Sequence, residues 1–217
     1  YTRCMGLPIK KLICASNANN VLTDFIETGV YDKNRPFYNT TSPSMDILIS
    51  SNLERLLYLL SGSDETVRGY MQQLAEKGRY AVDTPLRSAV QEAFAAGYCD
   101  DARTAETIAQ VYNKTGYLMD THTAVAYTVL EEYRQKTGDR TPAVVASTAS
   151  PFKFCNSVLG ALGEQELLPG TEILDQLTAR TGKAAPAPLA GLKGKQVRFT
   201  QSVEKGQMKA ALQEMLK

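Results

Sequence analysis

The stretch IKKLICA at residues 9–15, followed by the polar pair Ser16 and Asn17, decides the fold class. A short run rich in Ile and Leu that ends in polar residues predicts a buried strand opening into a loop. Apolar residues then fall at helical spacing over 19–28, and Gly29 suits the position just after a helix. A strand followed directly by a helix is typical of a layered α/β domain.

The remainder of the chain repeats this alternation. Further helices are expected over 44–60 (with an interruption near Ser50 and Ser51), 63–78, 101–115 and 123–137, and a last one up to 217. Residues 86–96 are expected to form a helix or a helix leading into a strand. Short strands are expected at 95–99, 142–147 and 196–200, of which PAVVAS at 142–147 is the clearest. We predict an α/β fold with three layers: helix, sheet and helix.

A connector rich in Pro, Ala and Gly at 182–194 suggests a boundary. We expect a main domain over 1–181 and a C-terminal part over 182–217 that holds the connector, a short strand and a helix. The 217 residues are 43% hydrophobic, which is enough for one sizeable core.

Composition excludes several classes of protein. The 24 basic and 23 acidic residues leave a net charge of +1, so nothing indicates a nucleic-acid partner. No apolar run reaches the length of a membrane span, and no signal-peptide pattern opens the chain. Four scattered cysteines and a single histidine favour neither a disulfide framework nor a metal site. We expect a soluble cytoplasmic protein without a membrane partner.

Polar residues follow two of the predicted strands, where α/β proteins gather ligands. After the first strand, Asn17, Asn19 and Asn20 stand at a helix N-terminus that could hold an anion. Asn is also a good capping and turn residue, and the spacing alone favours that interpretation.

After the strand at 142–147, the hydroxyls of Ser147, Thr148 and Ser150 crowd one turn, and Lys153 follows in the first helical turn. A hydroxyl here can bond a ring nitrogen or a phosphate oxygen, and a lysine can supply a point charge. Ordinary capping beside a solvated lysine explains the same residues.

The only histidine, His122, stands just before a helix. A lone histidine is more often structural than catalytic, but Asp120, two residues earlier, can fix its tautomer. No P-loop, GxGxxG or Ser-His-Asp order occurs, so hydrolase, kinase and dinucleotide functions lack support.

Three separated segments of the chain resemble threonine synthase, in that family's order. They are the run from GLPIKK to RLLY at 6–58, GYLMDTHTAVAY at 116–127 and VVASTASPFKF at 144–154. The resemblance covers residues 6 to about 162. It implies the large domain of a fold type II pyridoxal-phosphate enzyme, similar to tryptophan synthase β. It also implies conversion of O-phospho-L-homoserine and water to L-threonine and phosphate.

The resemblance implies roles for particular residues. Thr148 would place its hydroxyl against the pyridine nitrogen of the cofactor, with Ser147 beside it. Asp120, His122 and Thr123 match the family's acid-Pro-His-Thr segment on the cofactor side of the cleft, with Thr121 in place of the usual Pro. We therefore expect the corner at Ser147 to form half of a cleft that reaches His122.

Substrate contacts are assigned in the same way to Asn17, Asn19 and Asn20, with Lys153 as a candidate for the phosphate. The family's lysine motif, PTxAFKD, which forms the Schiff base, and its GNFGN loop lie upstream; neither string occurs here. The chain also begins at Tyr1 instead of Met.

From these absences we expect a C-terminal portion without a catalytic residue of its own, inactive alone, and a homodimer as its assembly. A non-catalytic α/β ligand-binding or interaction module on the same scaffold explains the missing lysine motif equally well.

Overall fold

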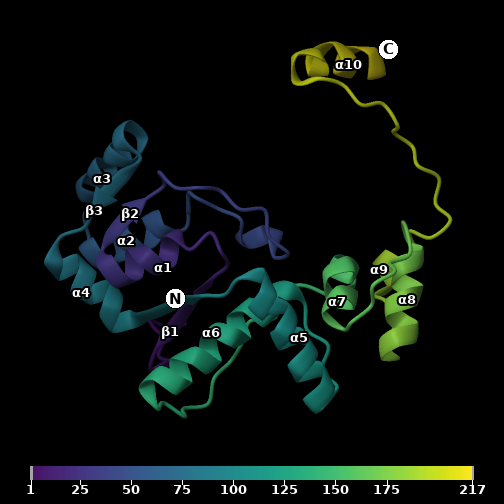
Figure 1. Ribbon diagram of the computed structural model, residues 1–217. Coiled ribbons are helices and arrows are strands. Elements are labelled where there is room, and N and C mark those ends of the chain that lie inside the picture. Colours follow the sequence, from purple (N-terminus) through teal and green to yellow (C-terminus); the bar gives the residue numbers. More distant parts are fainter. Residues whose placement is uncertain (1, 217) are drawn as a thin grey trace.

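Two parallel strands, β1 (Leu12–Ser16) and β4 (Phe94–Tyr98), organise the protein in the computed structural model, which describes residues 2–216 (Figure 1). Leu12 pairs with Phe94 and Ser16 with Tyr98, so the two strands run in register over their full length. The predicted strands at 9–15 and 95–99 are thereby confirmed, within one to three residues at each end.

Alternation along β1 places a helix on each face of this pair. Cys14 packs into the core that contains α1 (Val21–Thr28). Its neighbours Ile13 and Ala15 point the other way, into a cluster with Val125 and Val129 of α6 (Thr121–Thr137). The predicted order of helix, sheet and helix is therefore confirmed around β1 and β4.

The α1 side of the sheet carries the first core. It is formed by α1, α2 (Leu53–Ser61), α3 (Asp64–Lys77), α4 (Thr84–Ala93) and an antiparallel pair of β2 (Val30–Asp32) with β3 (Arg79–Ala81). At its centre Tyr31 and Tyr80 stack with ring centroids 5.3 Å apart. The predicted helices at 19–28, 63–78 and 86–96 are confirmed apart from their ends, whereas β2 and β3 were not predicted.

A second core lies beyond α6, away from the sheet. Its elements are α5 (Asp101–Thr115), a 3-10 turn η2 (Pro151–Phe154), α7 (Cys155–Ala161), α8 (Glu172–Thr181) and the short α9 (Ala187–Ala190). Ile108, Leu159 and Leu177 are the largest of its fully buried side chains. The predicted helices at 101–115 and 123–137 are confirmed, the latter beginning two residues earlier at Thr121.

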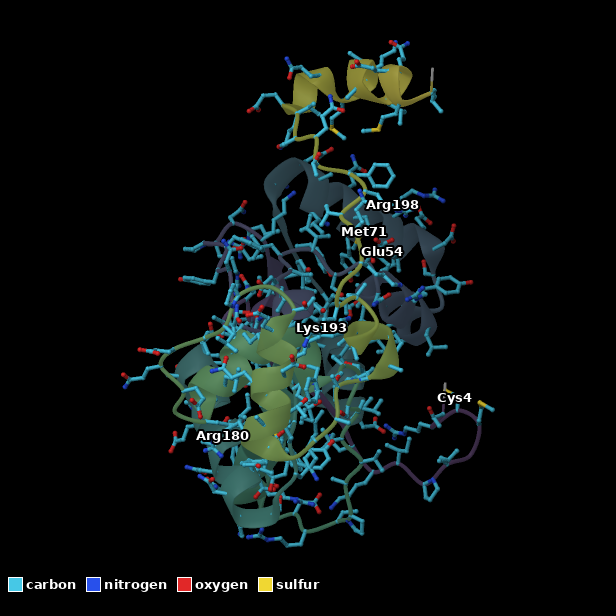
Figure 2. All side chains as sticks on the ribbon, turned by 90° about the vertical axis from the view of Figure 1, so that its right-hand side faces the viewer. Cys4, Glu54, Met71, Arg180, Lys193 and Arg198 are labelled. Carbon is cyan, nitrogen blue, oxygen red and sulfur yellow. The ribbon has the colours of Figure 1, made fainter. Side chains whose placement is uncertain are left out.

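The C-terminal arm leaves this second core after α9. It ends in a 3-10 turn, η3 (Lys205–Gln207), and α10 (Met208–Met215), which stands apart from the rest of the molecule (Figure 1). Lys193 and Arg198 mark the course of the arm in Figure 2. The last residue of the predicted final helix, 217, lies outside the described residues, and the boundary at 181/182 stays a prediction.

Two predicted strands are wrong. Residues 142–147 and 196–200 have no regular structure, and Val144, Val197 and Phe199 are largely exposed. A strand exists only where a neighbour accepts its backbone hydrogen bonds. Among residues 2–216 no strand pairs with either segment. The apolar β-branched composition of these segments is therefore not sufficient to form a strand.

The helix predicted over 44–60 begins only at Leu53, after a 3-10 turn η1 (Pro43–Met45). The buried Tyr31 explains the delay. Its hydroxyl donates to the carbonyl of Leu48 at 3.0 Å and accepts the N–H of Ser50 at 2.8 Å. These bonds engage backbone groups that a continuous helix would need for itself.

Gly97 sets how closely α6 approaches the sheet. A Cβ atom at Gly97 would lie 2.8 Å from Cγ1 of Val129, whereas one at Gly69 on α3 would meet no atom within 4 Å. We therefore expect Gly97→Ala to lower the free energy of unfolding by about 1–3 kcal/mol through overpacking. Gly69→Ala should raise it by up to about 1 kcal/mol, since alanine favours helix. Urea unfolding measures both free energies. An unchanged free energy of unfolding in Gly97→Ala would contradict the close packing.

Candidate functional site

A buried carboxylate begins helix α6. Asp120 is fully buried, and its Oδ1 accepts the backbone N–H groups of His122 at 2.9 Å and Thr123 at 3.4 Å. Its Oδ2 accepts the hydroxyl of Thr123. Free N–H groups and the helix dipole favour a negative charge at this position. Asp120 therefore caps the helix with its side chain and also binds the side chain of Thr123.

His122 is held on both sides of its ring. Nδ1 lies 3.1 Å from Oδ1 of Asp120, and Nε2 accepts the backbone N–H of Ser44 at 3.1 Å. The ring of Phe154 lies against the imidazole, with centroids 4.8 Å apart. His122 thus links α6 to the loop that precedes α2, and each of its nitrogens has a protein partner.

That loop, residues 38–46, is held by the predicted asparagine cluster. The side-chain amide of Asn17 donates to Oδ1 of Asp46 at 2.7 Å and to the hydroxyl of Thr40 at 2.8 Å. The amide of Asn19 donates to the carbonyl of Tyr38 at 2.8 Å and accepts the N–H of Tyr38 at 2.9 Å. Both asparagines are buried, so their amides serve the loop in this arrangement.

The capping interpretation of these asparagines is only partly correct. Asn17 accepts the backbone N–H of Asn19 at 2.9 Å, which is a turn role. Asn20 occupies the cap position of α1 but makes no side-chain capping bond, because its amide oxygen accepts Arg35 at 3.0 Å instead. Arg35 also pairs with Asp24 at 2.7 Å, so Asn20 belongs to a surface ion-pair cluster.

An open groove of about 950 Å³ lies between β1, α6 and residues 141–148. Thr148 and His122 both line it, as the expected cleft requires, together with Ser44. Most of its other lining is apolar, including Ile9, Ile13, Phe94, Leu130 and Val145. The corner that carries Ser147 and Thr148 is exposed and opens onto this groove.

The other predicted site residues do not line the groove. Ser147 is joined to Thr123 by a hydrogen bond of 3.1 Å between their hydroxyl oxygens, which ties the corner to α6. Lys153 is exposed on η2. None of Asp120, Thr123, Asn17, Asn19, Asn20 or Lys153 is among the lining residues.

The groove lining contains an ion pair that sequence reasoning missed. Nζ of Lys10 lies 2.8 Å from Oδ2 of Asp139, and Oδ1 of Asp139 accepts the N–H of Thr141 at 2.9 Å. The bond from Lys10, followed by those from Thr141, holds the pKa of the Asp139 carboxyl well below its usual range. Lys10 and Asp139 are separated by 129 residues, and no local pattern links them.

Ser44 was missed for a different reason, because it acts through a backbone N–H that any residue except proline supplies. Thr40, by contrast, left a signal in the polar run NTTSPSMD at 39–46, which is rich in residues that bond to nearby backbone.

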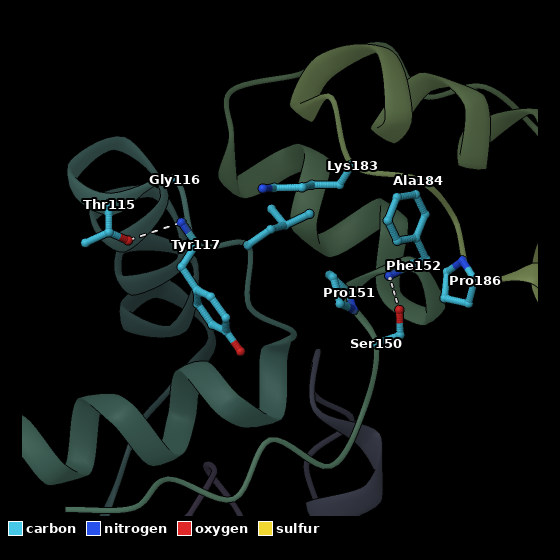
Figure 3. Close-up of a pocket in the computed structure, with 10 residues that line it drawn as sticks. Thr115, Gly116, Tyr117, Ser150, Pro151, Phe152, Lys183, Ala184 and Pro186 are labelled. Carbon is cyan, nitrogen blue, oxygen red and sulfur yellow. Dashed lines mark hydrogen bonds between the residues drawn. The ribbon is translucent and has the colours of Figure 1, made fainter.

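A second cavity of about 510 Å³ lies on the far side of the turn at Ser150 and shares no lining residue with the groove (Figure 3). Tyr117, Leu118, Phe152 and Lys183 are among its walls. Ser150 accepts the N–H of Phe152 at 3.3 Å at its edge, so capping there is confirmed.

Within residues 2–216, no group of three or more histidine, cysteine, aspartate or glutamate side chains is arranged to hold a metal ion. No helix in the same range has both the length and the apolar character needed to cross a bilayer.

Comparison with known proteins shows which proteins the chain is similar to. A family profile described as "Threonine synthase, C-terminal" matches residues 123–212. The chain is also 36% identical over 191 residues to threonine synthase of Saccharomyces cerevisiae, a match that covers 78% of this chain and 37% of the relative. Over most of its length the chain is similar to the C-terminal part of threonine synthases.

Other relatives agree with this placement. Human "Threonine synthase-like 1" is 40% identical over 169 residues, which cover 77% of this chain and 22% of the relative. The pyridoxal-phosphate-bound threonine synthase of Brucella melitensis superposes with a TM-score of 0.69 at 43% identity, over 77% of this chain and 36% of that one. The yeast structure superposes with a TM-score of 0.81 at 31% identity, over 99% and 44%.

These superpositions confirm the predicted fold class, that of the fold type II enzymes. The chain spans between about a fifth and two fifths of the length of the curated relatives named here.

The ion pair between Lys10 and Asp139 gives a titration test. Lys10→Gln should raise the pKa of Asp139 towards its ordinary value, as measured by carbon-13 NMR of the carboxyl groups. Because the folded pKa is lowered, the stabilisation is present above the ordinary carboxyl pKa and is lost as the pH falls through the folded one. Lys114→Gln on α5 is the control. An unchanged pKa of Asp139 in Lys10→Gln would contradict the pairing.

Proposed function

We propose that this chain is the C-terminal portion of a threonine synthase, a pyridoxal-phosphate-dependent lyase that converts O-phospho-L-homoserine and water to L-threonine and phosphate. The similarity to threonine synthases supports the reaction class. The observation that carries the proposal is the Thr148 hydroxyl, which is exposed on the wall of a groove that also reaches His122.

The groove has features that suit pyridoxal phosphate. Among residues 2–216 the Thr148 hydroxyl has no hydrogen-bond partner, although it lines a groove with mainly apolar walls. A neutral hydroxyl can bond the pyridine nitrogen without holding it as a cation, and the apolar walls suit the ring. When bound, the cofactor supplies an electron sink for the elimination and addition steps.

In this proposal the other residues at the α6 N-terminus support that contact. The hydroxyl of Thr123 is bonded to both Asp120 and Ser147, so the corner that carries Thr148 is anchored to a helix end instead of moving as a free loop. A ligand group held within a fraction of an ångström reacts far faster than a mobile one. Asp120 and Thr123 would thus orient the cofactor side of the groove.

The substrate contacts of Asn17, Asn19, Asn20 and Lys153 stay predictions. The asparagine network would serve substrate binding by shaping the loop at 38–46, which brings Ser44 to the groove. Lys153 is exposed and free to approach an anion. A homodimer, for which the exposed apolar residues Met208, Leu212 and Met215 of α10 give support, also stays a prediction, as does a cytoplasmic location.

The alternative is a non-catalytic ligand-binding or interaction module on the same scaffold. It explains the lack of a PTxAFKD-like motif in these 217 residues as well as the first proposal does. The identity to human "Threonine synthase-like 1", at 40%, is also no lower than that to the yeast threonine synthase, at 36%. Inactivity of this chain when isolated is expected from both proposals and does not separate them.

The test uses the full-length product of the gene that encodes this sequence, with added pyridoxal phosphate and O-phospho-L-homoserine. We expect release of phosphate and threonine. Thr148→Ala should lower kcat about 10- to 100-fold, which corresponds to the loss of one hydrogen bond of about 1.5–3 kcal/mol. Thr148→Ser keeps the hydroxyl and should retain most of the activity, and neither variant should change the Tm appreciably.

Two outcomes would contradict the proposal. Full activity of Thr148→Ala would remove the assigned contact. A full-length protein that binds the cofactor but releases no phosphate would favour the non-catalytic alternative.

A further inference from the structure

A chain of hydrogen bonds crosses the groove wall from the loop at 38–46 to the corner at Ser147. It starts at the backbone N–H of Ser44 and passes through the His122 ring, the Asp120 carboxylate and the Thr123 hydroxyl to Ser147. Ser44 and His122 are 78 residues apart in sequence, so the ring is a long-range connection.

The direction of these bonds fixes the tautomer of the ring. A backbone N–H can only donate, so Nε2 of His122 must offer its lone pair to Ser44. The ring proton is then on Nδ1, where the carboxylate of Asp120 accepts it at 3.1 Å. In this arrangement the imidazole is neutral, with one donor and one acceptor pointing in opposite directions.

His122 consequently has no ring nitrogen left for a ligand or for proton transfer to one. The side chain is 8% exposed, and Phe154 lies against the ring. Its ring therefore serves the groove only as part of the wall. A carboxylate at this place could not donate to Asp120, and an ammonium could not accept from Ser44. Imidazole meets both demands.

We propose that His122 is a positioning residue which, as the Nδ1–H tautomer, ties the loop at 38–46 to the α6 N-terminus and so sets the distance between the groove walls. The loop is also held elsewhere. The amide of Asn17 donates to Asp46 at 2.7 Å, and Asp101 accepts the N–H of Thr41 at 3.1 Å. These contacts hold residues on either side of Ser44, and the imidazole holds Ser44 itself, which lines the groove. The geometry stands by itself, and only its consequence for catalysis rests on the proposed function.

The first test reads the tautomer in the unmodified chain. Because His122 is the only histidine, nitrogen-15 labelling of histidine gives one pair of ring signals without assignment. At pH 8, long-range proton–nitrogen spectra should show a protonated Nδ1 and an unprotonated Nε2. The opposite tautomer, which free imidazole prefers, or an averaged mixture of the two would overturn the proposal.

The second test reads the loop by amide hydrogen exchange. His122→Phe keeps an aromatic ring but removes the acceptor, so exchange at the Ser44 amide should accelerate at least tenfold. Exchange at Thr40, whose amide is bound to Asp46, should change less than twofold. Unchanged exchange at Ser44 would overturn the proposal, as would equal acceleration at both amides, which indicates general loosening. If the variant does not fold, the tautomer measurement still decides.

Neither measurement depends on turnover. An inactive full-length protein with the Nδ1–H tautomer intact would contradict the proposed function alone. A full-length protein that is active but holds the other tautomer would contradict only the positioning role.

Discussion

The structure depends on the carboxylate of Asp120, a buried group whose four described hydrogen bonds all come from its own helix end. Burying a charge without hydrogen-bond partners costs several kcal/mol of folding free energy. The side chains that bond to the charge are therefore held in place. His122 and Thr123 are those side chains. His122 in turn bonds to the loop at 38–46, and Thr123 bonds to the corner at Ser147. A single cap thereby connects the two segments that bring Ser44 and Thr148 to the groove.

The β1–β4 pair gives this cap its position. Gly97 lets α6 lie directly on β4, and Ile13 and Ala15 of β1 fill the space around Val125 and Val129. The helix cannot slide along the sheet without creating cavities in a closely packed cluster. Packing on an apolar face thus determines where a polar helix terminus lies, and the groove forms at that terminus.

Sequence reasoning succeeded where the signal is local. The strand at 9–15 and the helix after it each follow from a few consecutive residues. It failed where a residue or strand distant in the sequence determines the local structure. The segment at 142–147 has the composition of a strand but no strand beside it, and the helix expected from residue 44 is delayed by the hydroxyl of Tyr31. The contact between Ser44 and His122 uses a backbone N–H and leaves no mark in the sequence.

The central claim is that Asp120 does more than cap a helix, and Asp120→Asn tests it most directly. Asparagine caps as well as aspartate, so Asp83→Asn on α4 and Asp100→Asn on α5, both caps of the ordinary kind, should change the free energy of unfolding by less than about 0.5 kcal/mol. Asp120→Asn should lower it by about 2 kcal/mol, because the ring N–H of His122 or the Thr123 hydroxyl then lacks its acceptor. Equal values for the three variants in denaturant unfolding would contradict the account.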